Sequence, residues 1–246
     1  MKASIFITCI CDNFYPEVGE ALVRILDKVG VETDFPREQV CCGQPALNTG
    51  YWEDTKSVAK TLLEAFKDSE YVVAPSGSCV VAIKDQYPML FENDPKYLPL
   101  VKELIPKIYE FSQFMGEVVK VSDLGARFPY KVTLHSSCHG SRLLGVTPHV
   151  HKLLAKVKDM EYIELPHAEN CCGFGGTFSV KQPEISEAMV DEKVFHIKQT
   201  GAEIVTGIDM ACLMNIHGRL QKEGSHIRAL HLIQLLDEGM KNETFH

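Results

Sequence analysis

Apolar residues recur every three or four positions in four segments of the chain, which is the spacing of one face of an α-helix. This pattern predicts helices over residues 17–29, 52–67, 149–157 and 184–200. Four other segments are continuous apolar runs rich in β-branched residues, typical of strands buried on both faces of a parallel sheet. These runs lie within residues 4–11, 70–79, 131–138 and 203–212. Strands that alternate with helices predict an α/β protein with parallel sheet.

The apolar runs and the residues after them occur twice. The run "SIFITCIC" of residues 4–11 matches "KVTLHSSC" of residues 131–138, and each ends in cysteine. A Cys-Cys-Gly sequence follows each run, at residues 41–43 and 171–173. Further on, "EYVVAPSGSC" and "EIVTGIDMAC" share an acid, an apolar run and a final cysteine. The chain therefore carries an internal repeat of about 130 residues.

The repeat predicts the domain organisation. We expect two pseudo-symmetric halves from an internal duplication, residues 1–126 and 127–246, each a mainly parallel sheet flanked by helices. Ligands of such sheets gather beyond the C-terminal ends of the strands, where loops from several strands converge. The cysteine loops of both halves are accordingly expected at those ends.

Composition and net charge exclude some classes of binding partner. Hydrophobic residues make up 45% of the 246 residues, charged residues 24%, and the formal net charge is −8. An acidic chain with scattered Lys and Arg is a poor partner for nucleic acid or anionic membranes. No apolar run approaches the roughly 20 residues of a membrane span, and residues 3–10 are too few for a signal peptide. We expect a cytoplasmic protein with no membrane span.

The nine cysteines indicate metal or redox chemistry. Nine is an odd number in a long chain, which argues against a secreted disulfide framework. Each half has one cysteine after its first run, an adjacent pair, and a fourth further on, and four thiolates hold an iron–sulfur cluster or a tetrahedral zinc. Adjacent cysteines suit a polynuclear centre, because they can bind different irons. Spacing alone leaves both Cys9 and Cys11 open as the first ligand of the first half.

Other residues near the cysteines are candidates for the same site. Gly43, Gly173, Gly175 and Gly176 allow the backbone to approach a cluster closely and donate N–H groups to its sulfurs. His135 and His139 flank Cys138, where a histidine either replaces a thiolate, relays a proton or merely makes a hydrogen bond at a strand end. Arg142 is the one arginine inside a cysteine motif and is a candidate to bind a carboxylate.

The cysteine motifs resemble those of a known family. They read "CICDNFYPEVG" from Cys9, "CCGQPALNTG" from Cys41, "HSSCHGSRLLG" from His135, "CCGFGGTFSVKQPEIS" from Cys171 and "DMACLMNIHG" from Asp209. In this order they are similar to the cysteine-rich CCG-domain family. That family includes the heterodisulfide reductase B subunit, the iron–sulfur subunit of glycolate oxidase and the C subunit of anaerobic glycerol-3-phosphate dehydrogenase.

The resemblance implies a ligand set, with two departures. Matched to the family pattern, which favours Cys9 over Cys11, the ligands are Cys9, Cys41, Cys42, Cys79, Cys138, Cys171, Cys172 and Cys212. The family pattern ends in CxxC, but Ser76 and Asp209 stand where its first cysteine is expected. Relatives with all five cysteines are associated with noncubane [4Fe-4S] clusters. The departures leave three options open: an ordinary [4Fe-4S] cluster, an iron open to substrate, or zinc in one half.

The resemblance also implies a function. The most similar members are iron–sulfur subunits of a multi-protein bacterial system that oxidises L-lactate to pyruvate. The implied role is electron transfer through up to one cluster per half, in a non-catalytic or co-catalytic subunit that works with a further iron–sulfur protein and meets lactate or pyruvate through the complex. The alternatives are a zinc-stabilised binding or scaffold subunit, with zinc also able to replace a cluster after oxidation, and a thiol–disulfide redox enzyme.

Overall fold

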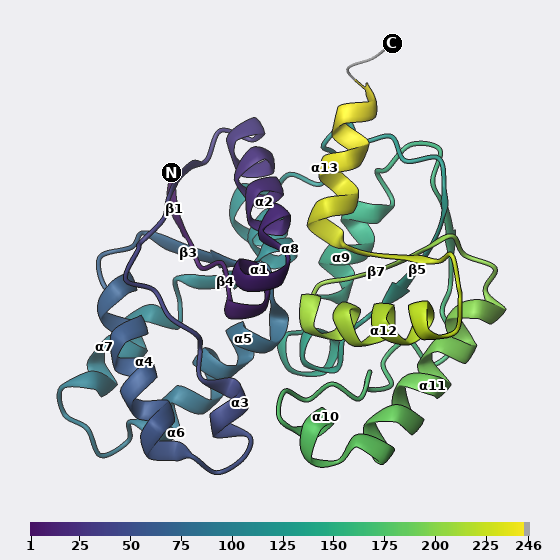
Figure 1. Ribbon diagram of the computed structural model, residues 1–246. Coiled ribbons are helices and arrows are strands. Elements are labelled where there is room, and N and C mark those ends of the chain that lie inside the picture. Colours follow the sequence, from purple (N-terminus) through teal and green to yellow (C-terminus); the bar gives the residue numbers. More distant parts are fainter. Residues whose placement is uncertain (244–246) are drawn as a thin grey trace.

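Two four-stranded parallel sheets form the framework of the protein. The computed structural model describes residues 1–243 (Figure 1). The first sheet has the strand order β2-β1-β3-β4 and the second has the order β6-β5-β7-β8. The strands are β1 Lys2–Ile5, β2 Glu32–Asp34, β3 Tyr71–Ala74, β4 Ile108–Glu110, β5 Lys131–His135, β6 Glu161–Ile163, β7 Ile204–Gly207 and β8 Arg228–His231. The same order in both sheets confirms the predicted α/β fold with an internal duplication.

Helices cover both sheets. In the first half they are α1 Cys9–Phe14, α2 Pro16–Lys28, α3 Gln44–Leu47, α4 Trp52–Phe66, α5 Gly77–Val81, α6 Tyr87–Leu90, α7 Tyr97–Leu104 and α8 Phe111–Gln113. In the second half they are α9 Thr147–Leu154, α10 Phe178–Lys181, α11 Pro183–Gln199, α12 Met210–Lys222 and α13 Leu232–Glu243. Three wider helical turns of the π type are η1 Ala82–Gln86, η2 Phe114–Val119 and η3 Gly140–Leu144. The four predicted helices correspond to α2, α4, α9 and α11.

The ends of the predicted strands differ from the structure. The run of residues 4–11 was expected to remain a strand up to its cysteine, but β1 ends at Ile5 and helix α1 begins at Cys9. Likewise β5 ends at His135, before Cys138. A left-handed residue, Thr8 in one half and Ser137 in the other, breaks the extended backbone just before the cysteine. The cysteines therefore lie beyond the strand ends rather than on them.

A hydrophobic core joins the two halves. It contains Leu22 and Ile25 of α2 together with Leu232 and Leu236 of α13, all buried. Figure 1 shows α2 and α13 side by side at the junction of the halves. Arg24 of α2 also forms a two-pronged ion pair with Asp237 of α13, at 3.0 and 2.8 Å. The last described helix of the second half is thus packed on the first half.

Each half also has a hydrophobic cluster of its own on the other side of its sheet, and each cluster includes a cysteine. Cys42 packs with Phe6 and Leu62 in the first half, and Cys172 packs with Val194 and Ile216 in the second. The predicted boundary after residue 126 falls in the connection between β4 and β5, and it stays a prediction. Among residues 1–243, the helices are all too short or too polar to cross a membrane.

Candidate metal centres

Eight of the nine cysteines meet in one place. A cavity of about 340 Å³ between the halves is lined by Cys9, Cys41, Cys42, Cys79, Cys138, Cys171, Cys172 and Cys212. These are the eight positions that the sequence predicts as metal ligands. Each cysteine follows the C-terminal end of a parallel strand, so the strand order of each sheet brings its four cysteines to one edge.

Cys9 and Cys11 have different surroundings. The sulfur of Cys9 lies 3.4 Å from the sulfur of Cys41 and faces the cavity. Cys11 is fully buried in the core that joins the halves, and burial raises the pKa of its thiol to about 12. Cys11 does not line the cavity, so its sulfur is not placed to share a metal with the other three cysteines of the first half. This placement supports Cys9 as the ligand.

The Cys-Cys-Gly turns have the same geometry in both halves. Gly43 and Gly173 have φ angles of 78° and 82°, a left-handed conformation that favours glycine. Their N–H groups donate to the sulfurs of Cys41 and Cys171, each at 3.4 Å. A Cβ atom on Gly173 would lie 2.6 Å from the carbonyl oxygen of Ser186, which no real contact allows. Glycine is therefore required for both the turn and its packing.

The backbone just before the first cysteine of each half is also left-handed. Thr8 has a φ of 66° and Ser137 a φ of 52°, and both residues are buried. Such conformations cost of order 1–3 kcal/mol in a residue other than glycine and persist where the surroundings hold them. The strain turns the chain from the strand into the cysteine loop, so Cys9 and Cys138 face the cavity.

Helix N-termini also point toward the cysteines. Helix α5 begins at Gly77, two residues before Cys79, and helix α12 begins at Met210, two residues before Cys212. The positive end of a helix dipole stabilises a thiolate in the first turn. The fourth cysteine of each half therefore lies in the first turn of a helix that begins at the cavity.

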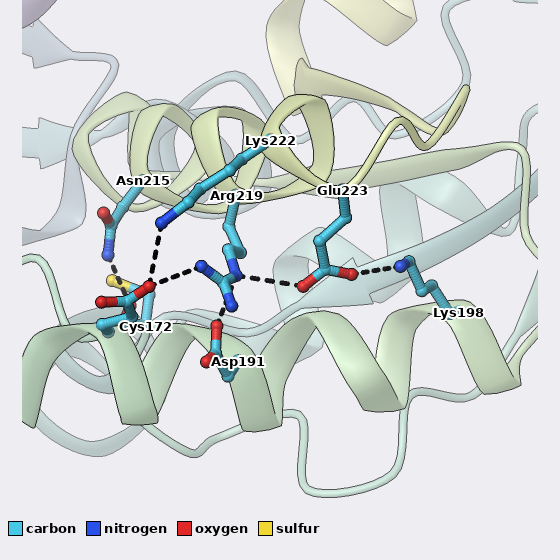
Figure 2. Close-up of polar contacts among 8 residues, drawn as sticks. Cys172, Asp191, Lys198, Asn215, Arg219, Lys222 and Glu223 are labelled. Carbon is cyan, nitrogen blue, oxygen red and sulfur yellow. Dashed lines mark hydrogen bonds and ion pairs between the residues drawn. The ribbon is translucent and has the colours of Figure 1, made fainter.

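The second cysteine of each pair is held through its carbonyl group. The hydroxyl of Tyr87 donates to the carbonyl oxygen of Cys42 at 2.8 Å, and the side-chain amide of Asn215 donates to that of Cys172, also at 2.8 Å. Figure 2 shows Asn215 reaching Cys172 beside a row of ion pairs that links α11 to α12. In that row Arg219 of α12 lies between Glu187 of α11 and Glu223, the residue that follows α12. The backbone of the pair is thus fixed by different residues in the two halves.

Crowding of the sulfurs shifts their pKa values in the same way in both halves. Hydrogen bonds from Cys42 and Cys9 lower the pKa of Cys41 to about 3. Hydrogen bonds from Cys138 and Cys172 lower the pKa of Cys171 to about 2. The pKa values of the donor thiols rise in turn, because a neighbouring thiolate and burial both oppose a second charge. A cation at each group of sulfurs would relieve this opposition.

The second half surrounds its cysteines with more polar groups. His135 is buried at the end of β5, and burial lowers its pKa to about 3, so the imidazole is neutral near pH 7. Lys193 of α11 is 1% exposed and donates to the carbonyl oxygens of His167 and Ala168, at 2.7 and 3.2 Å. Burial lowers the pKa of Lys193, whereas the thiolates of the second half favour its charged form. The ligand atoms of His135, Cys172 and Cys212 all lie within 4.8 Å of one another.

Of the remaining predicted site residues, some line the cavity and one does not. His139 lines the cavity with Nδ1 3.5 Å from the sulfur of Cys138, and its Nε2 lies 3.4 Å from the amide nitrogen of Gln44 in the other half. Gly175 and Gly176 also line the cavity. Arg142 does not, because its exposed guanidinium donates to the carbonyl oxygen of Glu169 at 3.0 Å.

Ser76 and Asp209 bind each other across the junction of the halves. The hydroxyl of Ser76 donates to Asp209 Oδ1 at 2.6 Å, and both residues are buried. The same carboxylate accepts from the hydroxyl and the N–H of Ser78, at 2.7 and 3.1 Å, and from the hydroxyl of Ser137 at 3.0 Å. Asp209 is therefore fully engaged in joining the two cysteine loops.

Sequence reasoning missed three residues that support the cysteines: Lys193, Tyr87 and Asn215. One signal was available for Lys193, since it lies on the face of α11 that also carries Val190 and Val194. The other two act on cysteine carbonyls 45 and 43 residues away along the chain, and no local pattern indicates such contacts.

The donor set as a whole fits an iron–sulfur centre or zinc. Each half offers four sulfurs, an N–H group aimed at one of them, and a helix N-terminus behind another. Thiolates and amide donors of this kind hold iron–sulfur clusters and tune their potential. The cysteine clusters thus indicate metal binding.

Comparison with known proteins agrees with this site. The family model described as a cysteine-rich domain, CCG, matches residues 3–84 and 132–217. Lactate utilization protein A 1 of Bacillus mycoides (strain KBAB4) is 54% identical over 241 residues, 98% of both chains. Lactate utilization protein A of Bacillus subtilis (strain 168) is 50% identical over 237 residues, 96% of this chain and 99% of that protein.

A solved structure supports the fold alone. A hypothetical protein from Helicobacter pylori superposes with a TM-score of 0.65 at 12% sequence identity, over 97% of this chain and 49% of that one. The two matched segments each contain one complete set of four cysteines. On the strength of the family match and of relatives that are half identical over nearly the whole length, the chain belongs to the cysteine-rich CCG-domain family.

Proposed function

We propose that this chain is a cytoplasmic iron–sulfur electron-transfer subunit of a multi-protein system that oxidises L-lactate to pyruvate. The observation that carries the proposal is the shared cavity, into which each half brings four cysteines. The name of the relatives, lactate utilization protein A, supports the substrate. A cavity with eight sulfurs fits two polynuclear centres, one per half.

The proposed ligands are the four cavity cysteines of each half. When bound there, a [4Fe-4S] cluster accepts and releases one electron at a time. The chain's own part is to hold the sulfurs as thiolates. The N–H groups of Gly43 and Gly173 donate to one sulfur of each set, and another sulfur of each set lies in the first turn of α5 or α12.

Oxidation of a 2-hydroxy acid to a 2-oxo acid releases two electrons and two protons. The two four-cysteine groups share one cavity, so the chain can take up the electrons singly, one at each group. In this proposal lactate is oxidised on a partner subunit. The electrons pass through this chain to a further iron–sulfur protein of the same complex, and the protons leave at the partner's site.

A co-catalytic role would involve residues of the cavity wall. His139 is the best placed of the three candidates, because it lies at the cavity beside Cys138 and Gln44. Arg142 would have to leave the carbonyl oxygen of Glu169 before it could bind a carboxylate. Both roles stay predictions.

The proposal is tested by metal analysis of protein purified without oxygen. We expect about eight irons and eight acid-labile sulfides per chain, with a broad absorption band near 400 nm that bleaches on reduction with dithionite. Zinc without iron, even after anaerobic reconstitution, would favour the zinc-stabilised scaffold. Disulfide reduction by metal-free protein would instead favour the thiol–disulfide enzyme.

A further inference from the structure

His135 is buried without satisfying its polar atoms. Within the described residues, neither ring nitrogen has a hydrogen-bond partner of good geometry, and the side chain is 1% exposed. The Ala168 backbone beside the ring makes at most a weak hydrogen bond with it. A buried polar atom without a partner destabilises the folded protein, so such a group calls for a partner.

The cysteines of the second half are within reach of this ring. The ligand atoms of His135, Cys172 and Cys212 are all within 4.8 Å of one another. Donors that share one tetrahedral ion lie roughly 3.5–4 Å apart, given metal–sulfur and metal–nitrogen bonds of about 2.3 and 2.0 Å. A small inward movement of these side chains would therefore place all three on one metal.

The first half has no such nitrogen. Ile5 of β1 and Leu134 of β5 hold corresponding positions in the two sheets, because Ile5 pairs with Val73 of β3 and Leu134 pairs with Thr206 of β7. Ile5 and Leu134 each come four residues before the first cavity cysteine of their half. The residue after each of these strand positions is Phe6 in the first half and His135 in the second. Phe6 is buried in the cluster that contains Cys42. The same place beside the cysteines is thus apolar in one half and offers nitrogen in the other.

Among residues 127–243, no carboxylate or further thiol is free to serve as an additional donor at these cysteines. Asp209 comes three residues before Cys212, but its two oxygens accept four hydrogen bonds from Ser76, Ser78 and Ser137. Binding a metal would require Asp209 to break the link between the halves. His135 is the group near Cys212 that has nitrogen lone pairs to offer.

We propose that His135 binds the metal of the second half through a ring nitrogen, so that this centre has an imidazole among its ligands while the first-half centre has thiolates alone. The inference deepens the proposed function and rests on it for the identity of the cluster. The assignment of His135 as a ligand does not depend on the proposed function, because zinc or cobalt would use the same donors. An imidazole in place of thiolate raises the potential of an iron–sulfur centre.

The consequence is a direction for electron flow. The second-half centre is expected to be reduced at a more positive potential than the first-half centre. Electrons that enter at the first half would then move to the second half across the shared cavity. The two halves would act as a donor and an acceptor rather than as two equal stores.

The test isolates one half at a time. Cys41→Ser/Cys42→Ser removes the first-half site, and the remaining centre is studied with and without His135→Phe, which copies Phe6. His139→Phe is the matched control, because His139 also lies at the cavity and beside a cysteine. After anaerobic reconstitution with iron and sulfide, pulsed electron paramagnetic resonance of the reduced centre reports any bound nitrogen.

We expect a strong nitrogen coupling in the parent variant. This coupling should disappear in His135→Phe and remain in His139→Phe. A coupling that survives His135→Phe would overturn the inference. If iron does not assemble at all, the proposed function fails, and Co²⁺ added alone decides the histidine ligand. In that case the Co²⁺ affinity of the site should fall roughly ten- to a hundredfold in His135→Phe, and by less in His139→Phe, which leaves every donor atom in place.

Stability of the metal-free protein separates a ligand from a structural residue. Phenylalanine removes two unpaired buried nitrogens, so the urea midpoint of metal-free His135→Phe should equal or exceed that of the parent. A lower midpoint with unchanged metal affinity would mean that His135 only supports the fold, which contradicts the inference. His135→Gln, which keeps a polar group, provides the second variant for the same measurements.

Discussion

The two halves of the molecule place their sulfurs alike but surround them differently. Both have a left-handed residue before the first cysteine, a left-handed glycine after the pair and a helix that begins just before the fourth. Behind the pair, however, the first half has Phe6 and Leu62, both buried. The second half has His135 and Lys193, also buried.

The correspondence of Leu62 with Lys193 follows from helix packing. Gly43 lies against Thr55 of α4, and Gly173 lies against Ser186 of α11. Leu62 and Lys193 each come seven residues later, on the same buried face. The comparison teaches that the backbone determines where the sulfurs lie, whereas a few buried side chains determine the charge around them. Two centres of one ancestry can thereby differ in chemistry.

Loss of a cysteine gives the largest expected effect, because a cluster needs all its ligands. Cys42→Ser and Cys172→Ser should each lose the iron of one half, about four atoms per chain, and keep the other centre. Cys11→Ser is the control, since Cys11 lies in the core and away from the cavity. Iron and sulfide analysis of anaerobic protein measures the result. Loss of all iron in either variant would show that the halves hold one joint centre.

Removal of the Asp209 carboxylate should weaken the junction of the halves. Asp209→Ala leaves hydroxyl and N–H donors of three serines without their buried acceptor, which should destabilise the protein by about 3 kcal/mol. Asp209→Asn keeps one carbonyl oxygen and should cost roughly half as much. Urea unfolding of metal-free protein measures both. Equal stability of Asp209→Ala and wild type would refute the role of the link.

The ends of β4 and β8 carry buried groups with opposite pH dependence. Glu110 pairs with Ala74 in one sheet, and His231 pairs with Gly207 in the other. Burial raises the pKa of Glu110 to about 7 and lowers the pKa of His231 to about 4. Glu110 keeps its proton in the folded state after the unfolded chain has lost it. His231, conversely, stays neutral after the unfolded chain has taken a proton.

The opposite pKa shifts of Glu110 and His231 give opposite dependences of stability on pH. Glu110 makes stability fall as pH rises from about 4.5 to about 7, by up to about 3 kcal/mol, and Glu110→Gln should remove that fall. His231 makes the free energy of unfolding fall as pH drops from about 6.5 to about 4. His231→Gln should remove this dependence on pH. Unfolding free energies at several pH values measure both. A constant difference between Glu110→Gln and wild type from pH 4 to 8 would contradict the first prediction.

Replacement of the buried ammonium is the mildest change. Lys193→Met keeps the length of the side chain but removes its positive charge, which should move the potential of the second-half centre to more negative values. Leu62→Met is the matched control in the first half and should move neither potential. Redox titration followed by electron paramagnetic resonance measures the shift. A positive shift in Lys193→Met would mean that the ammonium does not stabilise the reduced centre.

Much of the fold could be predicted because its signals are local. The apolar spacing located α2, α4, α9 and α11, and the repeated runs located β1, β3, β5 and β7. Strand β2, with one exposed and two half-buried residues, and the equally short β4 and β6 have no comparable signal. Their existence depends on pairing with the central strands, which is a tertiary property.

The sequence predicts which cysteines form the candidate site, but it does not predict the side chains that surround them. Repetition singled out the eight cysteines, and the rule for parallel sheets brought them to one edge. Ser76 and Asp209 were noticed as departures from the family pattern, but their contact joins residues 133 positions apart. The contacts of Tyr87 and Asn215 with cysteine carbonyls are likewise long-range. Such pairings follow from packing and leave no periodic trace in the sequence.

The packing of α13 on α2 has a consequence for synthesis of the chain. All four cavity cysteines of the first half leave the ribosome long before residues 232–243 do. Until then the apolar face of α2 lacks Leu232 and Leu236. A nascent first half therefore has its thiols in place while one side of its core is still open, and insertion of metal at that stage would precede completion of the fold.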